Sequence, residues 1–431
     1  MPNRKEQTHP LAVGVPLYTL GTPHTHSFCL SLYLRGGSIH ESAERSGVTH
    51  FIEHLIFRSI NRRLDGKLYE TLDRLGLAVE GVTYRELTQL SITGAPQHFD
   101  AAVEILSLAL APLSLSMDDF LTERSRIKAE IREEGEKTSL DYFTDRTLFG
   151  DDAPTSRPIT GWASGLSRMS RAFVYAEKER LFSKENLFFY LTGAFPEDAP
   201  ATLDAATRTY SLPSDARRES IVPVPDAFFH RDATVAVKGS DKTLVRLSFD
   251  VDTARYTDAS LTLLYDVLFG DGEESFFHRV MSEGSGLLYS FRGVLDAYRN
   301  VGVIGVTYEI APRLLEKSLS LALGAIARAK TEAAGALPFV RAPYTDNAAF
   351  LLDDGAALNF NRAYETKILS LPYATVASRA AAYASVTGEA LCRMAKEIFR
   401  AENATLTLKG RALDTQKLRA LLIQGLEDPT P

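Results

Sequence analysis

The sequence predicts an α+β fold of two similar lobes, each a largely antiparallel sheet covered on one face by helices. The chain has 431 residues, which is more than one hydrophobic core usually holds and favours two domains. The second observation is an internal repeat. The third is that strand-like runs and pairs of helical patterns follow one another without regular strand–helix alternation, which favours antiparallel sheets with helices on one side.

The repeat is clearest where two similar strand-like segments are preceded by helical patterns and closed by glycine. These segments are "ENLFFYLTG" at 185–193 and "ENATLTLKG" at 402–410, and the same shift along the sequence aligns "FCLSLYLRGG" from Phe28 with "VRLSFDVDTA" from Val245. Between the copies, "SLPSDARRESIVPVPDA" is rich in proline and charge and has no periodicity, as in a linker. We therefore predict an N-terminal lobe at 1–215, a linker at 216–228 and a homologous C-terminal lobe at 229–431.

The first lobe shows the succession of patterns in most detail. Strands are predicted at 27–35 and in "AVEGVTY" and "LTQLSITG", and helices near 46–57 and 66–75. Two longer helical patterns follow at 97–112 and 117–137.

Charge and hydropathy argue against a nucleic-acid partner and against insertion into a membrane. The net charge of −7 and the lack of a long Lys/Arg run argue against nucleic acid. A polar N-terminus and the lack of any apolar run of about 18 residues argue against a signal peptide and a membrane span.

Cys29 and Cys392 lie in apolar patterns typical of buried free thiols. A cytoplasmic location is the expectation.

The stretch "THFIEHLIFRS", residues 49–59, places polar residues in an apolar helical run. With Ser46 as N-cap and 100° per residue, His50, Glu53 and His54 share an arc of about 100°, and the apolar residues occupy the other side. Two imidazoles one turn apart can reach a single Zn²⁺, and the carboxylate beside them can act as a base without binding the metal. A solvated helix face is the alternative interpretation.

A third protein ligand is expected from the helix predicted at 117–137. Glu123, Glu130 and Glu134 share one stripe of this helix, whereas Glu133 points elsewhere. Helical phase alone does not choose among the three carboxylates, and a charged solvent face would have the same pattern.

His50, Glu53 and His54 form the sequence H-x-x-E-H, which is the inverted zinc motif of inverzincins. Two longer stretches, one that contains this motif and one that follows it, agree with a known family. With "RGGSIHESAERSGVTHFIEHLIFRS" and "YETLDRLGLAVEGVTYRELTQLSITG", the chain resembles the M16 (pitrilysin-type) metallopeptidases, in particular the two-lobed M16B processing peptidases. The third ligand of that family is the second glutamate of an E-x6-E pair about eighty residues beyond the first histidine. Glu123 and Glu130 match this pair, so the resemblance implies Glu130 as ligand and Glu123 as a carboxylate behind the ligands.

The resemblance implies a hydrolytic zinc site. Zn²⁺ would be held by His50, His54 and Glu130, with Glu53 as the general base in the endopeptidic hydrolysis of unfolded or short peptides. The substrate would add as an extended strand to a sheet edge formed by Glu80, Gly81, Val82 and Thr83. Glu80 departs from the family, which usually has asparagine there, so an acceptor-only carboxylate replaces an amide donor.

A second departure concerns the R-x6-Y segment that active family members present to the carbonyl of the scissile bond. Tyr289 matches the tyrosine, but Ser282 stands in place of the arginine, and Arg279 is out of register with it. The resemblance therefore implies the zinc-bearing subunit of a heterodimer whose homologous M16B partner supplies arginine and tyrosine, or else a homodimer. A non-catalytic structural or assembly subunit and a peptide-binding chamber without turnover are the alternatives.

Overall fold

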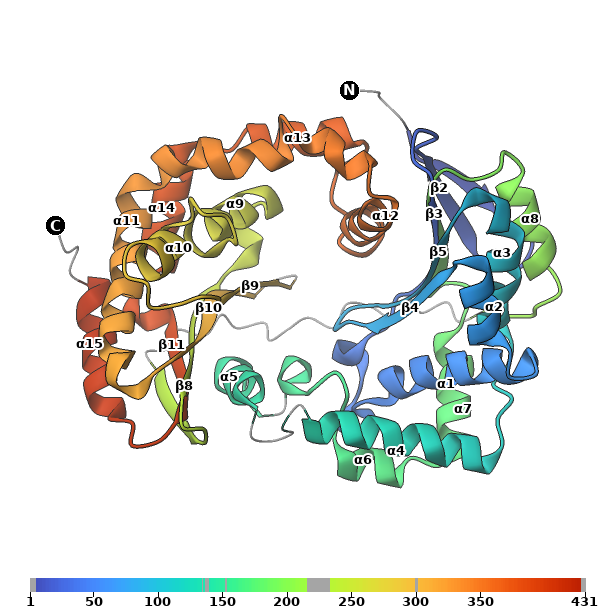
Figure 1. Cartoon of the computed structure of the whole chain (residues 1–431), viewed down its shortest axis with the longest axis horizontal. Helices are drawn as coiled ribbons and strands as arrows, with labels where there is room; N and C mark the ends of the chain where they lie inside the picture. The colour runs from blue at the N-terminus through green and yellow to red at the C-terminus, as the bar shows by residue number, and fades with distance from the viewer. Residues whose placement is uncertain are drawn as a thin grey trace. The chain divides into compact units, whose positions relative to one another are not determined.

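The computed structural model describes residues 5–133, 135, 139–151, 153–214, 233–298 and 301–427. The chain divides into two compact units (Figure 1). Unit 1 comprises Met1–Glu134, Arg157–Val222 and Ala349–Ser378, and unit 2 comprises Gly135–Ser156, Pro223–Ala348 and Arg379–Pro431.

Unit 1 is built on a six-stranded sheet with the order β1-β2-β6-β3-β5-β4. Only the pairing of β2 with β6 is parallel within the described residues of this sheet. All residues of the central strands β3 and β6 are buried, in keeping with their near-continuous apolar sequences. The strands are β1 (Gln7–Pro10), β2 (Pro16–Gly21), β3 (Phe28–Leu34), β4 (Ala78–Thr83), β5 (Thr88–Gly94) and β6 (Leu187–Gly193).

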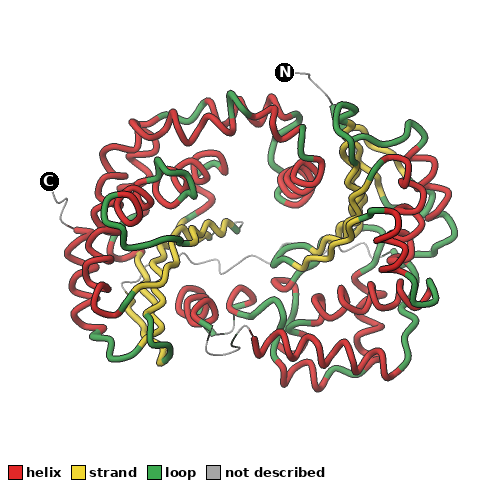
Figure 2. Tube along the Cα trace, in the orientation of Figure 1, coloured by secondary structure: helices red, strands yellow, loops and turns green. Residues whose placement is uncertain are grey.

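Unit 2 repeats this arrangement in a five-stranded sheet with the order β7-β11-β8-β10-β9 (Figure 2, yellow). Its one parallel pair among the described residues, β7 with β11, corresponds to β2 with β6, and β11 is related to β6 by the shift of the sequence repeat. The predicted fold of two homologous α+β lobes is confirmed. The strands are β7 (Ala233–Lys238), β8 (Thr243–Val251), β9 (Arg292–Ala297), β10 (Gly302–Ile310) and β11 (Ala404–Gly410).

Helices supply most of the apolar side chains that pack on each sheet. In unit 1 the helices are α1 (Val48–Arg63), α2 (Leu68–Leu75), α3 (Phe99–Ser107), α4 (Met117–Glu133), α6 (Ala163–Arg168), α7 (Arg171–Leu181), α8 (Ala199–Thr207) and α12 (Gly355–Ala363). In unit 2 they are α5 (Leu140–Phe149), α9 (Asp258–Phe269), α10 (Phe276–His278), α11 (Leu315–Arg341), α14 (Gly388–Ile398) and α15 (Thr415–Glu427), and α13 (Val376–Ala384) begins in unit 1 and ends in unit 2.

Two helices lie in the unit opposite to the one that the sequence order suggests. Helix α5 follows unit 1 in the chain but packs on β8 and β11 of unit 2, and α12 follows unit 2 but packs on β3 and β6 of unit 1. The shift that relates the two sequence copies aligns the first residue of α5, Leu140, with Ala357 of α12. The two copies therefore exchange equivalent helices, and each of these helices contacts the sheet of its unit.

Asn359 shows how α12 is held on the sheet of unit 1. Its side-chain nitrogen donates to the carbonyl oxygens of Cys29 and Tyr190, and its oxygen accepts from the Tyr33 hydroxyl, at 2.8–2.9 Å. Because all these groups are buried, losing the amide would leave them without partners at a cost of about 1–3 kcal/mol each.

The predicted domain limits remain a prediction. The two units include the exchanged segments 135–156 and 349–378, which simple limits at 215 and 229 do not separate. The predicted linker at 216–228 lies outside the described residues. Within the described part of the chain, no helix combines the length and the apolar composition that a membrane span requires.

Candidate metal centre and active site

The start of α1 positions the H-x-x-E-H motif. The helix begins at Val48, and Glu41 rather than Ser46 caps it: the Glu41 carboxylate accepts hydrogen bonds from the backbone N–H groups of Gly47 at 2.7 Å and Thr49 at 2.8 Å. The predicted cap by Ser46 is wrong because its hydroxyl is buried and has no hydrogen-bond partner among the described residues. The capping carboxylate comes from a turn further upstream, where local pattern rules do not look.

A glycine pair holds this end of the helix close to another loop. Gly47 has φ of 88° and Gly161 has φ of 71°. A Cβ atom on Gly47 would lie 2.5 Å from the Thr160 carbonyl oxygen, and one on Gly161 would lie 2.3 Å from the Ser46 carbonyl oxygen. Both the backbone conformation and the contact therefore require glycine at these positions.

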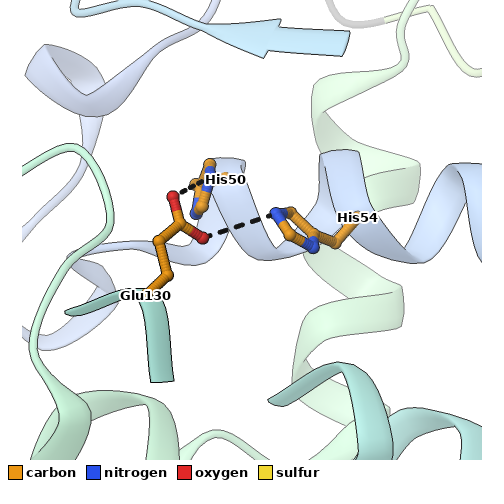
Figure 3. A group of neighbouring side chains, drawn as sticks. All are labelled: His50, His54 and Glu130. Carbon is orange, nitrogen blue, oxygen red and sulfur yellow. Dashed lines mark ion pairs between the residues drawn. The ribbon is translucent and has the colours of Figure 1, made fainter. Parts of the chain in front are cut away.

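The apolar side of α1 is buried as predicted, and His50 and His54 on the opposite polar arc face α4. His50, His54 and Glu130 each offer one ligand atom, and these atoms lie within 4.8 Å of one another (Figure 3). The Nε2 atom of His50 is 3.6 Å from Oε1 of Glu130, and the Nε2 atom of His54 is 3.8 Å from Oε2. Ligands of one tetrahedral Zn²⁺ lie about 3.3 Å apart, so small side-chain adjustments make this set fit the metal.

The two histidines have different electrostatic surroundings. Burial, with the charge of His54, lowers the pKa of His50 to about 3, which keeps its imidazole neutral, as metal binding requires. Burial also acts to lower the pKa of His54, but the hydrogen bond to Glu123 and the nearby carboxylates of Glu53 and Glu130 raise this pKa above its ordinary value. A bound divalent cation would neutralise these carboxylates in place of the proton.

Glu123 lies behind His54, on the side away from Glu130, and connects α4 to α1. Its Oε2 atom is 3.5 Å from Nδ1 of His54, and its Oε1 atom accepts from Arg58 at 2.9 Å and from Arg126 at 3.2 Å. Burial raises the pKa of Glu123, but the His54 hydrogen bond and the two arginines lower it overall. An ionised Glu123 orients the His54 ring so that Nε2 faces Glu130.

Glu53 projects from α1 toward β4. The Thr83 hydroxyl donates to its Oε2 atom at 3.0 Å, and burial raises the pKa of the carboxyl group above its ordinary value. Gly81 makes this approach possible, because a Cβ there would lie 2.3 Å from the Phe57 ring and 2.7 Å from Oε1 of Glu53. A poorly solvated carboxylate beside a metal site has the properties of a general base.

The four predicted substrate-binding residues lie on β4, an edge strand of its sheet that pairs with β5. Glu80 is exposed, Gly81 and Val82 are half-buried, and Thr83 is buried. Edge strands present main-chain groups that an extended peptide can pair with.

The remaining predicted residues belong to unit 2 or lie outside the described residues. Glu134 lies outside the described residues. Tyr289 belongs to unit 2, where its side chain is fully exposed, and Ser282 lies in the π-helical turn Arg279–Glu283. Arg279 forms an ion pair with Glu274 at 3.4 Å.

Sequence reasoning missed two groups at the site. One is the capping residue Glu41. The other is Arg58, which follows the motif by one helical turn, donates to Asp119 and Glu123, and lines a pocket beside Glu53. Its i+4 spacing from His54 was the available signal.

This two-histidine, one-glutamate cluster with a neighbouring carboxylate is the ligand chemistry of a hydrolytic zinc site. Residues 18–148 match the family model described as Insulinase (Peptidase family M16), and this part of the chain is a Peptidase M16 domain. The predicted family resemblance is confirmed for this domain.

Relatives and solved structures extend the similarity. An uncharacterised zinc protease of Rickettsia felis is 22% identical over 309 residues, 70% of this chain and 73% of that protein. The mitochondrial-processing peptidase subunit beta of Saccharomyces cerevisiae is 27% identical over 172 residues, 38% of this chain and 36% of that protein.

Two solved structures share the fold. A protease from Helicobacter pylori has a TM-score of 0.80 and 15% identity, covering 95% of this chain and 100% of that one. A peptidase M16 inactive domain from Pseudomonas fluorescens has a TM-score of 0.79 and 14% identity, covering 95% and 98%.

Proposed function

We propose that this chain is a zinc-dependent endopeptidase subunit that hydrolyses unfolded or short peptides. The observation that carries this proposal is the convergence of His50, His54 and Glu130 within 4.8 Å, with Glu53 beside them. The relatives named as zinc proteases support zinc as the metal. A cytoplasmic location stays a prediction.

The residues around the centre account for the chemistry. Zn²⁺ held by His50, His54 and Glu130 would supply Lewis acidity and lower the pKa of water. Glu53 accepts a proton from the attacking water and delivers it to the leaving amine, and Thr83 orients its carboxylate for both transfers. Glu123 holds the proton on Nδ1 of His54, which leaves Nε2 free to bind metal.

The substrate would pair with the edge of β4. Main-chain hydrogen bonds along Glu80, Gly81, Val82 and Thr83 would place a peptide carbonyl near Glu53 with little dependence on sequence. The exposed Glu80 carboxylate accepts but does not donate, so it would bind the N–H groups of the substrate and not its carbonyls.

A homologous partner would complete the site. Ser282 offers no cation for the developing oxyanion, and a second M16B chain carrying arginine and tyrosine would supply it, as a heterodimer or, failing that, a homodimer. The similarity to a processing peptidase subunit supports this arrangement.

Metal removal tests the proposal. The purified chain should contain about one Zn²⁺, because three converging protein ligands complete a catalytic-type site, and chelation should abolish cleavage of an unfolded peptide until Zn²⁺ is returned. The His54→Ala variant serves as the matched control and should lose the metal. Retention of wild-type zinc by this variant would contradict the proposed site.

The second candidate is a non-catalytic structural or assembly subunit. The absence of arginine at Ser282 and the fold similarity to an M16 inactive domain favour it. It predicts that no homologue restores hydrolysis to the zinc-loaded chain.

A further inference from the structure

A pocket of about 270 Å³ in unit 1 opens beside the proposed catalytic base. Its lining follows α1 from Glu53 and His54 past Phe57 and Arg58 to Asn61 and also includes Arg126 of α4. Since a helix rises about 5.4 Å per turn, Arg58 lies about one turn from the motif. The side chain of a peptide residue next to the scissile bond can span this distance.

Arg58 and Arg126 of the pocket lining belong to an ion-pair network in which guanidinium groups outnumber carboxylates. Three guanidinium groups, those of Arg58, Arg62 and Arg126, meet two carboxylates, those of Asp119 and Glu123. Arg58 is bonded to both carboxylates and Arg62 donates to Asp119 at 2.7 Å, so these two arginines are engaged.

Arg126 is the group left available. Within the described part of the chain it bonds only to Glu123, through Nη1 at 3.2 and 3.4 Å, and its side chain is 65% exposed. The other nitrogens of a guanidinium can bind a second carboxylate in a bidentate geometry.

The remaining walls limit what the pocket accepts. Phe57 and Val79 contribute apolar surface that suits a methylene stem. Glu53 faces the pocket at the motif end, and Glu130 carries negative charge in the neighbouring metal cluster, so a carboxylate is repelled there and attracted toward Arg126.

We propose that this pocket selects an acidic substrate residue, glutamate or aspartate, next to the scissile bond, and that Arg126 determines this specificity by binding its carboxylate. The inference rests on the proposed peptidase function.

The test measures binding without turnover. Zinc-loaded Glu53→Gln chain is titrated with short, unstructured, fluorescein-labelled peptides that are identical except for Glu, Gln or Lys at alternate positions. The Glu peptide should bind about threefold to tenfold more tightly than the Gln peptide, which is the range of a partly solvated charge pair. The net negative charge of the chain acts in the opposite direction, so it cannot cause this preference.

Variants on α4 separate local recognition from overall charge. In the same background, Arg126→Gln should remove the preference for Glu and Arg126→Lys should keep part of it. Arg132 is exposed on another face of α4, so Arg132→Gln should leave the preference for the Glu peptide unchanged. Zinc content and circular dichroism verify that each variant is folded.

The outcomes distinguish the two claims. Equal affinity for Glu and Gln peptides, equal losses with Arg126→Gln and Arg132→Gln, or no binding of any peptide would overturn the inference. If the wild-type zinc-loaded chain binds Glu peptides selectively but cleaves none with any homologue, the proposed peptidase function fails and the pocket specificity stands.

Discussion

At the scale of single residues, the choice among the acidic side chains of α4 defines the metal centre. Glu130 points at both histidines, Glu123 reaches Nδ1 of His54 from behind, and Glu133 is exposed. Helical phase predicted that Glu123 and Glu130 share a stripe, and the structure places both against α1. Phase could not rank them, because the ranking depends on how α4 approaches α1.

We expect Glu130→Gln to lower the zinc affinity most, because it removes a charged ligand. Glu123→Gln should lower this affinity by about 10–100-fold, the usual effect of a group that orients a ligand. Glu133→Gln is the matched control on the same helix and should behave as wild type. Competition with a chromogenic chelator measures the three affinities, and equal losses for Glu130→Gln and Glu133→Gln would contradict Glu130 as the third ligand.

At the scale of elements, the N-terminus of α1 depends on a residue outside the helix. The Glu41 carboxylate is buried and accepts two backbone N–H groups that have no intrahelical acceptor. Sequence rules place a cap next to the helix and therefore indicated Ser46, whereas a buried acceptor from an upstream turn requires knowledge of the fold.

Glu41→Ala should destabilise the chain by about 1–3 kcal/mol, because two buried donors lose their acceptor, and should also weaken zinc binding by loosening the turn before His50. Denaturant unfolding and zinc titration measure the two effects. Glu44→Ala, an exposed neighbour, is the control, and the account of the cap is wrong if both variants unfold alike.

Helix α9 of unit 2 contains a group that should make stability depend on pH. Burial raises the pKa of Asp266 to about 6, although the Tyr344 hydroxyl donates to its Oδ2 atom at 2.8 Å. The folded state then holds the proton more tightly than the unfolded state, whose pKa is near 3.8. This contribution is fully present below the unfolded pKa and is lost as the pH rises through about 6.

Each unit of pKa difference is worth about 1.36 kcal/mol, and partial access of the carboxyl group to solvent reduces the total. The contribution of Asp266 to the free energy of unfolding is therefore about 2 kcal/mol. Asp266→Asn keeps an acceptor for Tyr344 and removes the titration. Its free energy of unfolding should therefore change less than that of wild type between pH 4 and pH 7. Parallel profiles for the two proteins would contradict this assignment.

At the scale of the whole molecule, the internal sequence repeat predicted two homologous lobes, and the matching strand orders of the two sheets confirm them. The exchange of α5 and α12 was not predictable, because each amphipathic pattern indicates a buried face but not the sheet that buries it. The contacts of Asn359 with Cys29 and Tyr190 join residues that lie far apart in the sequence, which local periodicity cannot reveal.

The chain alone should be a weak peptidase because Ser282 cannot stabilise the oxyanion. A homologue with an intact R-x6-Y segment should raise turnover of an unfolded peptide by about 10²–10³, the usual worth of one oxyanion donor. Changing the arginine of that homologue to alanine should remove the gain, while Tyr289→Phe in this chain should matter less. Full activity of the isolated chain would mean that another donor completes the site, with Arg279 the first to examine.

The roles of Glu53 and of the metal are tested together by comparing the zinc-loaded wild type with the Glu53→Gln variant, both with the same homologue. The two quantities measured are the zinc content and the rate of cleavage of one unfolded peptide. We expect both proteins to contain about one zinc per chain and the variant to cleave the peptide about 10²–10⁴-fold more slowly, because the base is lost while the ligands remain. Unchanged hydrolysis by Glu53→Gln, or loss of its zinc, would contradict the assignment of Glu53 as the base beside a metal held by His50, His54 and Glu130.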